Sequence, residues 1–327
     1  MTTTPRRRGS AAAAVLLSAA LVLAACGSDG DAAGDKAGET HSVTADNGTI
    51  EVPVDPQRVV TIGNTTLPFI DMGGEPVGVT DVSASELGLI PEDQRTTFEA
   101  GTSLGASADQ IDLEQLAGLE PDLILAQFPE SEFEPLEKQL GSIAPTVFWG
   151  LGTEWKAFAD GLAQAGNLTD GLGEQKAEFE DKITRIQETY GEIIDDTSFV
   201  NLDRWASSDP GTFSIADFGC VEIAQDDIGM DFPRAAEGED PLGWTSLPFE
   251  QLAELSEYDV ITYPVDAEGR PTEPFAPVVE TNTWKALPAV GSGRALGVFC
   301  PGNNSYGPVL QYLDSLDAAL ATLPAKE

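Results

Sequence analysis

The most regular apolar pattern in this chain of 327 residues runs from about Gly173 to Asp195. Its large side chains recur at alternating spacings of four and three, at Phe179, Ile183, Ile186, Tyr190 and Ile193. This spacing predicts an α-helix with one apolar stripe, about 33 Å long at 1.5 Å per residue. Acid-before-base pairs at Glu178 with Lys182 and at Asp181 with Arg185 would support it. A coiled-coil dimerisation helix is the alternative, but barely three heptads would make it weak.

On either side of this helix, short apolar runs alternate with polar stretches. The runs are 58–62, 77–79, 123–126 and 146–148 before the helix, and 199–202, 212–215, 260–263 and 295–298 after it. Strands of this kind alternating with helices favour parallel sheets covered on both faces. The pattern therefore predicts an α/β fold.

An internal repeat divides the chain into two similar α/β lobes. Leu-Glu-Gln-Leu-Ala at 113–117 precedes the apolar run 121–125, and Phe-Glu-Gln-Leu-Ala at 249–253 precedes the run 258–261. Each copy is typical of a short helix that leads into a buried strand. We expect an N-terminal lobe over 49–168, a connecting helix over 169–195 and a C-terminal lobe over 196–327.

The first residues have the character of an export signal. Three arginines, Arg6 to Arg8, precede an uncharged apolar run over 11–25, which is too short to span a membrane. The run closes with Leu-Ala-Ala before Cys26, the pattern of a bacterial lipobox, so we expect a signal peptide over 1–25 and an acylated (palmitate-bearing) Cys26. The alternative is an ordinary signal peptide with an incidental cysteine.

A stretch rich in Gly, Ala, Asp, Ser and Thr follows Cys26, and we interpret residues 26–48 as a flexible tether. His41, the only histidine of the chain, falls inside it. The folded body would then contain no histidine, which excludes Ser-His-Asp and Cys-His catalysis and His-ligated metal sites.

Composition narrows the function further. The formal net charge of −38 argues against nucleic acid as a partner, because the chain could not neutralise a row of phosphates. There is no phosphate-binding P-loop, so energy for any transport would come from a partner ATPase. The acidic stretch from Asp226 to Asp240 lacks the ligand spacing of a calcium loop, and we interpret it as solvated surface.

The two remaining cysteines, Cys220 and Cys300, are an even number in an exported chain. This favours one disulfide between them, which would restrict the unfolded chain by about 4 kcal/mol. Two buried free thiols are the alternative.

Taken together, these segments resemble the ferric-siderophore class of solute-binding lipoproteins that feed ABC importers. The resemblance is carried by the lipobox at Cys26, Pro-Gln-Arg-Val-Val at 56–60, Pro-Val-Gly-Val-Thr at 76–80, the block 112–126, Trp-Lys-Ala-Leu-Pro-Ala-Val at 284–290 and Gly-Arg at 293–294. It implies two Rossmann-like lobes with mainly parallel sheets, joined by one long rigid helix, with the ligand in the cleft between the lobes. It also implies a monomeric binding protein rather than an enzyme, anchored by lipid to the outer face of the cytoplasmic membrane.

The resemblance also implies a function for the internal repeat at 113–117 and 249–253. In this class one surface glutamate on each lobe docks into arginine pockets of the permease, and Glu114 and Glu250 occupy the matching positions. Each could also be simply a helix-start acid favoured by the helix dipole.

Ligands of α/β lobes meet the loops that follow the carboxyl ends of the strands. We expect the ligand-binding residues there to be Asn64, Thr66, Phe128, Trp149, Trp155, Arg204, Trp205, Phe213, Phe218, Tyr263, Asn303 and Tyr306. The guanidinium of Arg204 could donate to oxygens around a ferric centre, although a salt bridge to a nearby acid is the alternative. One candidate arginine is few for a trianionic catecholate complex, which favours a neutral or cationic hydroxamate complex.

The sequence therefore predicts an extracytoplasmic protein that captures an iron-siderophore complex and delivers it to an ABC permease with its cytoplasmic ATPase. We expect no cofactor and no metal bound directly by the protein. Cobalamin or haem as the ligand of the same fold is the first alternative. An exported carboxylate-dependent hydrolase is the second.

Overall fold

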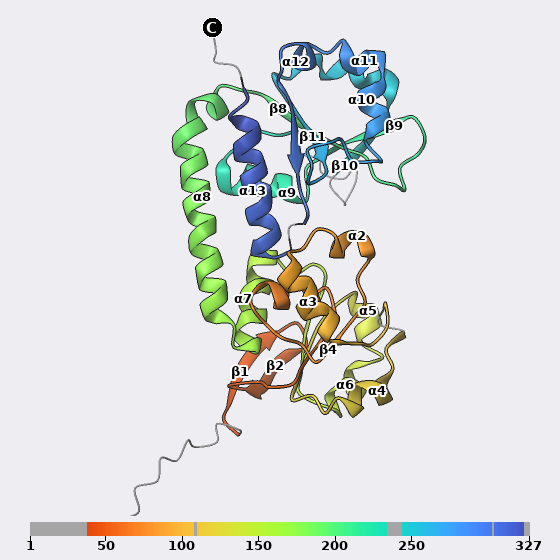
Figure 1. Cartoon of the computed structure of the whole chain (residues 1–327), viewed down its shortest axis with the longest axis vertical. Coiled ribbons are helices and arrows are strands. Elements are labelled where there is room, and N and C mark those ends of the chain that lie inside the picture. Colours follow the sequence, from red (N-terminus) through yellow and green to blue (C-terminus); the bar gives the residue numbers. More distant parts are fainter. Residues whose placement is uncertain (1–37, 108–109, 234–243, 303, 324–327) are drawn as a thin grey trace, which may run out of the picture. The chain divides into compact units, whose positions relative to one another are not determined.

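Two five-stranded sheets organise the chain in a computed structural model that describes residues 38–107, 110–233, 244–302 and 304–323 (Figure 1). The first sheet has the order β5-β4-β3-β6-β7, and every neighbouring pair is parallel. Its strands are β3 (Val59–Gly63), β4 (Gly78–Val79), β5 (Thr102–Ser103), β6 (Leu123–Gln127) and β7 (Thr146–Trp149). The four strands predicted in the first half are therefore confirmed.

The second sheet has the order β10-β9-β8-β11-β12. Its strands are β8 (Phe199–Asp203), β9 (Thr212–Ala216), β10 (Trp244–Pro248), β11 (Val260–Val265) and β12 (Ala295–Phe299). The pairs of β11 with β8 and β12 are parallel, whereas β9 pairs antiparallel with both β8 and β10. The four predicted strands are confirmed, but the expectation of parallel pairing is wrong for β9, and β10 was not predicted.

The strands of the two sheets follow the same order along the chain. In each sheet the chain enters at the middle strand, moves outward over two strands on one side, and then returns to fill the two positions on the other side. The order thus reverses between β3 and β6 in the first sheet and between β8 and β11 in the second. In an open α/β sheet such a reversal leaves a crevice at the carboxyl ends of the strands, where ligands bind.

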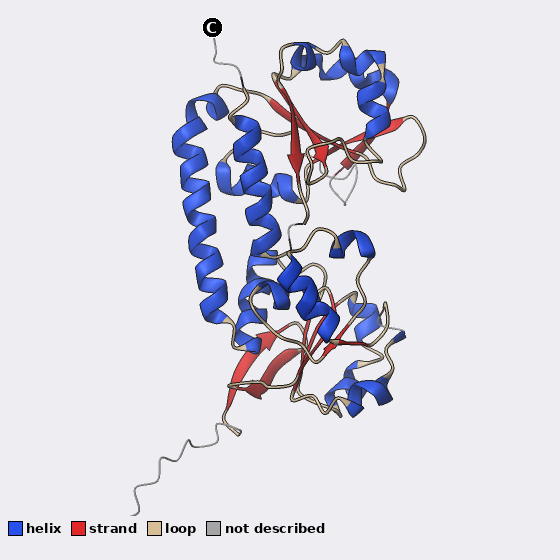
Figure 2. Cartoon of the chain, viewed as in Figure 1, coloured by secondary structure: helices blue, strands red, loops and turns tan. Residues whose placement is uncertain are grey.

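Helices cover the faces of both sheets (Figure 2). Those of the first lobe are α1 (Thr66–Asp71), α2 (Ala84–Leu87), α3 (Glu92–Ala100), α4 (Leu113–Gly118), α5 (Glu130–Phe133), α6 (Glu137–Gly141) and α7 (Trp155–Gly166). Those that follow are α8 (Thr169–Asp195), α9 (Cys220–Ile223), the π-helix η2 (Ala224–Ile228), the 3-10 helix η3 (Phe249–Glu257), α10 (Ala276–Glu280), α11 (Asn282–Lys285), α12 (Pro288–Gly291) and α13 (Tyr306–Leu320). None of the helices among the described residues is long and apolar enough to cross a membrane.

One hydrophobic core joins the two sheets. It contains Val59 and Leu125 of the first sheet, Phe199 and Val260 of the second, and most of the buried face of α8 and α13. The opposite face of each sheet has a core of its own. That of the first sheet includes Ile124, and that of the second sheet lies wholly within the second lobe. Each sheet is therefore covered on both faces, as predicted.

The long helix α8 confirms the predicted connecting helix, and it lies beside α13 (Figure 1). Phe179, Ile183 and Ile186 of the predicted stripe are buried. Lys182 binds Glu178, as predicted, and also Asp314 of α13. The predicted pair of Asp181 with Arg185 is replaced by a pair of Arg185 with Asp317 of α13. The polar face of α8 therefore helps to fix α13, and the stripe is covered by the same chain rather than by a second copy.

Burial and neighbouring charges shift the pKa of Lys182 in opposite directions. Burial lowers the pKa of this ammonium, but the hydrogen bonds and charges of Asp314 and Glu178 outweigh it and raise the pKa above its usual range. The charged form is thus retained at the contact between α8 and α13.

The predicted tether is too long at its C-terminal end. The strands β1 (Thr40–Ala45) and β2 (Gly48–Pro53) form an antiparallel hairpin, in which His41 is paired with Val52. Imidazole Nε2 of His41 lies 3.0 Å from the carbonyl oxygen of Gln164. The folded body therefore begins before residue 49 and contains one histidine, which corrects the expectation that it has none. Cys26 lies outside the described residues.

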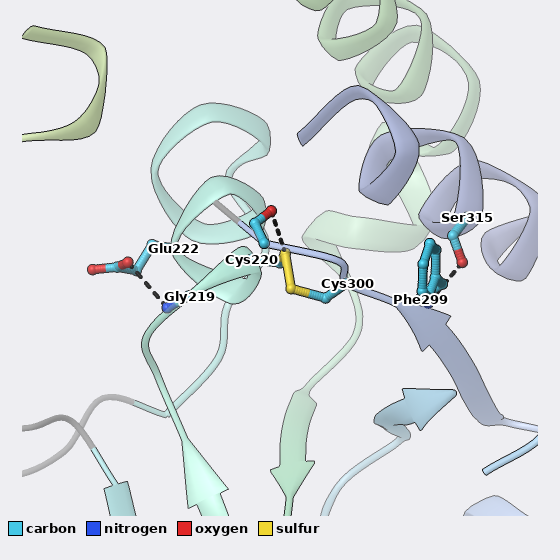
Figure 3. Close-up of a disulfide and its surroundings, with 7 residues drawn as sticks. Gly219, Cys220, Glu222, Phe299, Cys300 and Ser315 are labelled. Atoms are coloured by element: carbon cyan, nitrogen blue, oxygen red, sulfur yellow. Dashed lines mark hydrogen bonds between the residues drawn. A yellow bond between two sulfur atoms is a disulfide. The ribbon is translucent and has the colours of Figure 1, made fainter. Parts of the chain in front are cut away.

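A disulfide joins Cys220 at the start of α9 to Cys300 after β12, with 6.1 Å between the two Cα atoms (Figure 3). It confirms the predicted pairing. Nearby, Gly219 donates its backbone N–H to Glu222 over 3.1 Å, and Phe299 donates to the hydroxyl of Ser315 over 2.8 Å. Sγ of Cys220 lies 3.5 Å from the carbonyl oxygen of Gly302, a contact without a hydrogen bond because a disulfide sulfur has no proton. The disulfide thus ties α9 to the loop that leads into α13.

Candidate functional site

A first cavity of about 410 Å³ lies at the strand ends of the first lobe. Asn64 after β3 and Gln127 at the end of β6 line it, so it occupies the point where the strand order reverses. The other described residues that line it are Leu151, Thr153, Glu154, Trp155, Lys156, Phe158, Glu222, Ile223, Asp226, Asp227 and Asn304. The cavity therefore lies between the first lobe and the α9–η2 segment of the second.

Backbone contacts hold the β3 and β6 ends of this cavity together. Gly63 has φ +67°, and a Cβ there would lie 2.2 Å from the carbonyl oxygen of Gln127, so only glycine fits. The next residue, Asn64, donates its N–H to that same oxygen over 2.9 Å. This close approach places the side chains of Asn64 and Gln127 on the same wall.

The start of α7 supplies the aromatic and basic groups of the cavity. The carboxylate of Glu154 caps the helix by accepting from the backbone N–H groups of Lys156 (3.0 Å) and Ala157 (2.9 Å). The cap fixes the start of α7 and therefore the positions of Trp155 and Lys156 in its first turn. Trp155 packs edge-on against Phe179 of α8, with ring centroids 6.1 Å apart, and against Tyr306 at 4.8 Å.

Lys156 connects the two sides of the cavity. Its Nζ lies 2.5 Å from Oδ1 of Asp227 on η2 and about 5 Å from the ring centroids of Trp155 and Phe179. The π-helix around Asp227 is a rare geometry that often occurs at functional sites. Four carboxylates and one ammonium line the cavity, so its charge is negative.

A second cavity of about 240 Å³ lies at the strand ends of the second lobe. Asp203 is the last residue of β8 and Trp205 follows that strand, while Tyr263 and Pro264 belong to β11, so this cavity also occupies the reversal of strand order. The disulfide and the buried Tyr312 complete its described lining together with Asn201, Leu202, Phe218, Gly219, Val221, Thr262 and Val298. No lysine or arginine is among these described residues.

Asp203 is the one carboxylate on the described walls of the second cavity. Its Oδ1 accepts the backbone N–H of Arg204 over 2.7 Å. Burial raises the pKa of this carboxyl to about 6, and the hydrogen bond from Arg204 opposes the rise. Burial therefore makes the charged form of Asp203 unfavourable.

A groove of about 560 Å³ along α7 and α8 shares Lys156 and Asp227 with the first cavity. Tyr306 lines it and packs against Phe179 with ring centroids 5.5 Å apart. Burial, and then the negative charges of Asp160, Glu154, Asp227 and Glu180, raise the pKa of Tyr306 to about 12. Its hydroxyl is therefore neutral at physiological pH.

The structure separates the predicted ligand-binding residues into groups. Asn64 and Trp155 line the first cavity, Trp205, Phe218 and Tyr263 line the second, and Tyr306 lines the groove. Thr66, Phe128, Trp149 and Phe213 are instead buried, with relative exposures from 0% to 6%. The last three are core residues at or next to strand ends, so the expectation that they face a ligand is not supported. Asn303 lies outside the described residues.

Arg204 is directed into the protein instead of toward a ligand. Its guanidinium donates to the carbonyl oxygens of Thr212 (2.9 Å), Pro274 (2.6 Å) and Asp209 (3.5 Å), and it lines neither cavity. Among the described residues, this guanidinium therefore forms hydrogen bonds to the backbone in place of the expected ligand contact and of the alternative salt bridge. We do not retain Arg204 as a ligand-binding residue.

Sequence reasoning missed Lys156, Asp203 and Asp227. Asp227 belongs to the acidic stretch that was interpreted as solvated surface, yet its side chain is only 19% exposed and is paired with Lys156. A signal was present for two of them, because Asp203 directly follows the predicted strand over 199–202 and Lys156 follows a predicted ligand residue, Trp155.

Glu114 and Glu250 lie at corresponding points of the two lobes. Glu114 is in the first turn of α4, which precedes β6, and Glu250 is in the first turn of η3, which precedes β11. Both glutamates are exposed. The repeat in the sequence is thus a repeat in the structure.

Comparisons with known proteins agree with this architecture. The periplasmic binding protein family matches residues 36–296. The iron(3+)-hydroxamate-binding protein FhuD of Bacillus subtilis (strain 168) is 26% identical over 289 residues, which is 83% of this chain and 84% of that protein.

Solved structures give the same result. The siderophore periplasmic binding protein from the fuscachelin gene cluster of Thermobifida fusca is 25% identical, with a TM-score of 0.70 over 83% of this chain and 99% of that chain. SirA of Staphylococcus aureus, solved with staphyloferrin B, is 20% identical, with a TM-score of 0.62 over 86% and 99% of the two chains, and it shows the shared fold.

Proposed function

Because the chain belongs to the periplasmic binding protein family, we propose that it captures a ferric siderophore complex outside the cytoplasm and delivers it to the permease of an ABC importer. The observation that carries the proposal is the location of the two cavities. Each lies where the strand order of its sheet reverses, and the relatives named for siderophore and ferric-hydroxamate binding have the same fold. The protein acts by binding, and the ligand rather than the protein holds the iron.

The charge of the cavities favours a neutral or cationic ferric hydroxamate. Glu154, Glu222, Asp226 and Asp227 outnumber Lys156 in the first cavity, and the second contains Asp203 without a basic side chain among its described walls. A trianionic ferric catecholate would be repelled by this field, whereas a complex without negative charge would not be. The structure gives no specific support for cobalamin or haem.

The aromatic residues of the cavities supply the contact area. Trp155 in the first cavity and Trp205 in the second are large, rigid rings that can pack against the organic part of a chelate. Asn64 and Gln127 add side-chain amides whose N–H groups can donate to the hydroxamate oxygens.

We extend the proposal to the membrane anchor and to the contacts with the permease. Lipid-modified Cys26 would anchor a monomeric protein to the outer face of the cytoplasmic membrane. Glu114 and Glu250, exposed at equivalent helix starts, would dock on basic pockets of the permease.

Tryptophan fluorescence provides the test. The protein would be titrated with a ferric trihydroxamate, a ferric tricatecholate, haem and cobalamin, and in parallel as the Trp155→Phe and Trp205→Phe variants. We expect saturable quenching by the hydroxamate complex, reduced in one or both variants, and at least tenfold weaker binding of the catecholate. Saturation by cobalamin or haem alone, or by none of the four, would overturn the proposal.

A further inference from the structure

The second cavity combines a carboxylate with aromatic walls. Trp205 and Phe218 stack with ring centroids 5.6 Å apart and an interplanar angle of 27°. Tyr263 is held by Phe275, stacked at 5.6 Å, and by Trp284, edge-on at 5.4 Å. Asp203 lines the same cavity as Trp205, Phe218 and Tyr263. The aromatic rings are thus positioned by packing before any ligand enters.

The carboxylate of Asp203 has no cationic partner among the described residues. The nearest basic side chain in the sequence, Arg204, gives Asp203 only its backbone N–H and directs its guanidinium to the carbonyl oxygens of Thr212 and Pro274. A partly buried carboxylate without a counter-charge is unfavourable, and a bound cation would remove that cost. Aromatic rings attract cations as well, through the negative potential of their faces.

We propose that the second cavity binds an alkylammonium group, with Asp203 as its counter-charge and Trp205, Phe218 and Tyr263 as its aromatic walls. The inference rests on the proposed function in one respect, since it takes this group to be a pendant arm of the ferric complex. A volume of about 240 Å³ equals that of roughly eight liquid waters, enough for an ammonium and a few methylenes.

One helix, α9, lines both cavities. Cys220 and Val221 of this helix line the second cavity, while the next residues, Glu222 and Ile223, line the first. A ligand that contacts both faces of α9 would occupy both cavities. The first cavity would then hold the iron centre and the second the charged arm.

A matched pair of ligands isolates the charge of the arm. The ferric complex of desferrioxamine B, a linear trihydroxamate with a pendant ammonium, would be compared with the ferric complex of its N-acetylated form, which keeps the iron centre and removes the charge. We expect the ammonium form to bind the wild-type protein at least tenfold more tightly.

Variants assign the difference to Asp203. Asp203→Asn should reduce the preference to within twofold, and Asp203→Glu should recover part of it. Asp209→Asn, an exposed aspartate in the loop after β8, removes the same charge and should leave the preference unchanged. Thermal melting of each variant establishes that it is folded.

The failures of the two proposals are distinguishable. Equal binding of both complexes by the wild-type protein, or a preference that survives Asp203→Asn, would overturn the ammonium site and leave the proposed function standing. If neither complex binds, the ligand class is wrong, and n-pentylammonium alone then decides the site by NMR. Its saturable binding near Trp205, lost in Asp203→Asn, would support the site, and the absence of binding would refute it.

Discussion

Lys156 of α7 and Asp227 of η2 form an ion pair of 2.5 Å between the first lobe and the second, at the wall that the first cavity shares with the groove along α8. Their side chains are 35% and 19% exposed, so water screens the pair only in part. The ammonium also lies over the rings of Trp155 and Phe179. This contact is therefore both a part of the candidate site and a link between the lobes.

A double-mutant cycle should reveal this link. We expect Lys156→Met and Asp227→Asn each to lower the free energy of unfolding, with a coupling of about 1 kcal/mol between them because the pair is partly desolvated. Urea denaturation measures both quantities. The exposed pair of Arg270 and Glu268 is the control, and its cycle should show no measurable coupling. Equal coupling in the two cycles would mean that the Lys156 pair contributes no more than a surface pair.

Arg204 should act on stability rather than on binding. Arg204→Ala removes charged hydrogen bonds to the carbonyl oxygens of Thr212 and Pro274, and we expect a loss of about 2 kcal/mol in unfolding free energy. The dissociation constant of the ferric hydroxamate should change by less than threefold. A tenfold loss of affinity without a loss of stability would return Arg204 to the site.

Asp203 should make the unliganded protein less stable as pH rises from about 4 to about 6. Burial raises the pKa of this carboxyl to about 6 in the folded protein, above its unfolded value, so the folded state binds the extra proton in this range. Asp203→Asn should therefore raise the free energy of unfolding by up to about 2 kcal/mol at pH 7 and by little at pH 4. Tyr263 and Tyr312, which line the same cavity, have pKa values raised by burial and stay neutral throughout. A gain of the same size at both pH values would argue against titration of Asp203.

Glu114 and Glu250 should affect transport and not capture. We expect Glu114→Lys or Glu250→Lys to leave the ligand dissociation constant within threefold, because neither residue lines a cavity, and to reduce uptake through the cognate permease sharply. Glu188→Lys on the exposed side of α8 is the control for the change in net charge and should keep uptake near wild type. Loss of affinity in step with loss of uptake would contradict the docking assignment.

Cys26→Ala should release the protein from the membrane or block its processing. The reason is that two or more acyl chains are needed for stable anchoring, and the cysteine would carry them. Cell fractionation and the intact mass of the mature chain measure the outcome. A variant that stays membrane-bound with unchanged mass would show that Cys26 is not acylated.

The strands and the long helix could be predicted because burial alone determines their pattern. The direction of β9 could have been predicted as well, since the segment between Asp203 and Thr212 is shorter than the dozen residues that a parallel crossover needs. The hairpin of β1 and β2 was missed because most of its residues are small or polar and only two of them, Val43 and Val52, are fully buried. Asn47-Gly48 at its turn is nevertheless a strong hairpin signal.

The candidate site was less predictable for a different reason. Trp149 and Phe213 belong to strands, and the pleat directs alternate side chains into the core whatever loop follows. Asp227 acquires its role from Lys156, a partner distant in sequence, and Asp203 acquires its role from the lack of a cationic partner among the described residues. Local composition does not contain that information.

The core shared by both sheets, together with the ion pairs between α8 and α13, has a kinetic consequence. Proteins that close around a ligand by bending at a hinge spend part of the binding energy on closure, and they let the ligand escape each time they reopen. Here the lobes are joined by packed side chains instead of a flexible strand crossing. The residence time of the ligand should then be set by the contacts within the cavities themselves and not by the rate at which a hinge reopens.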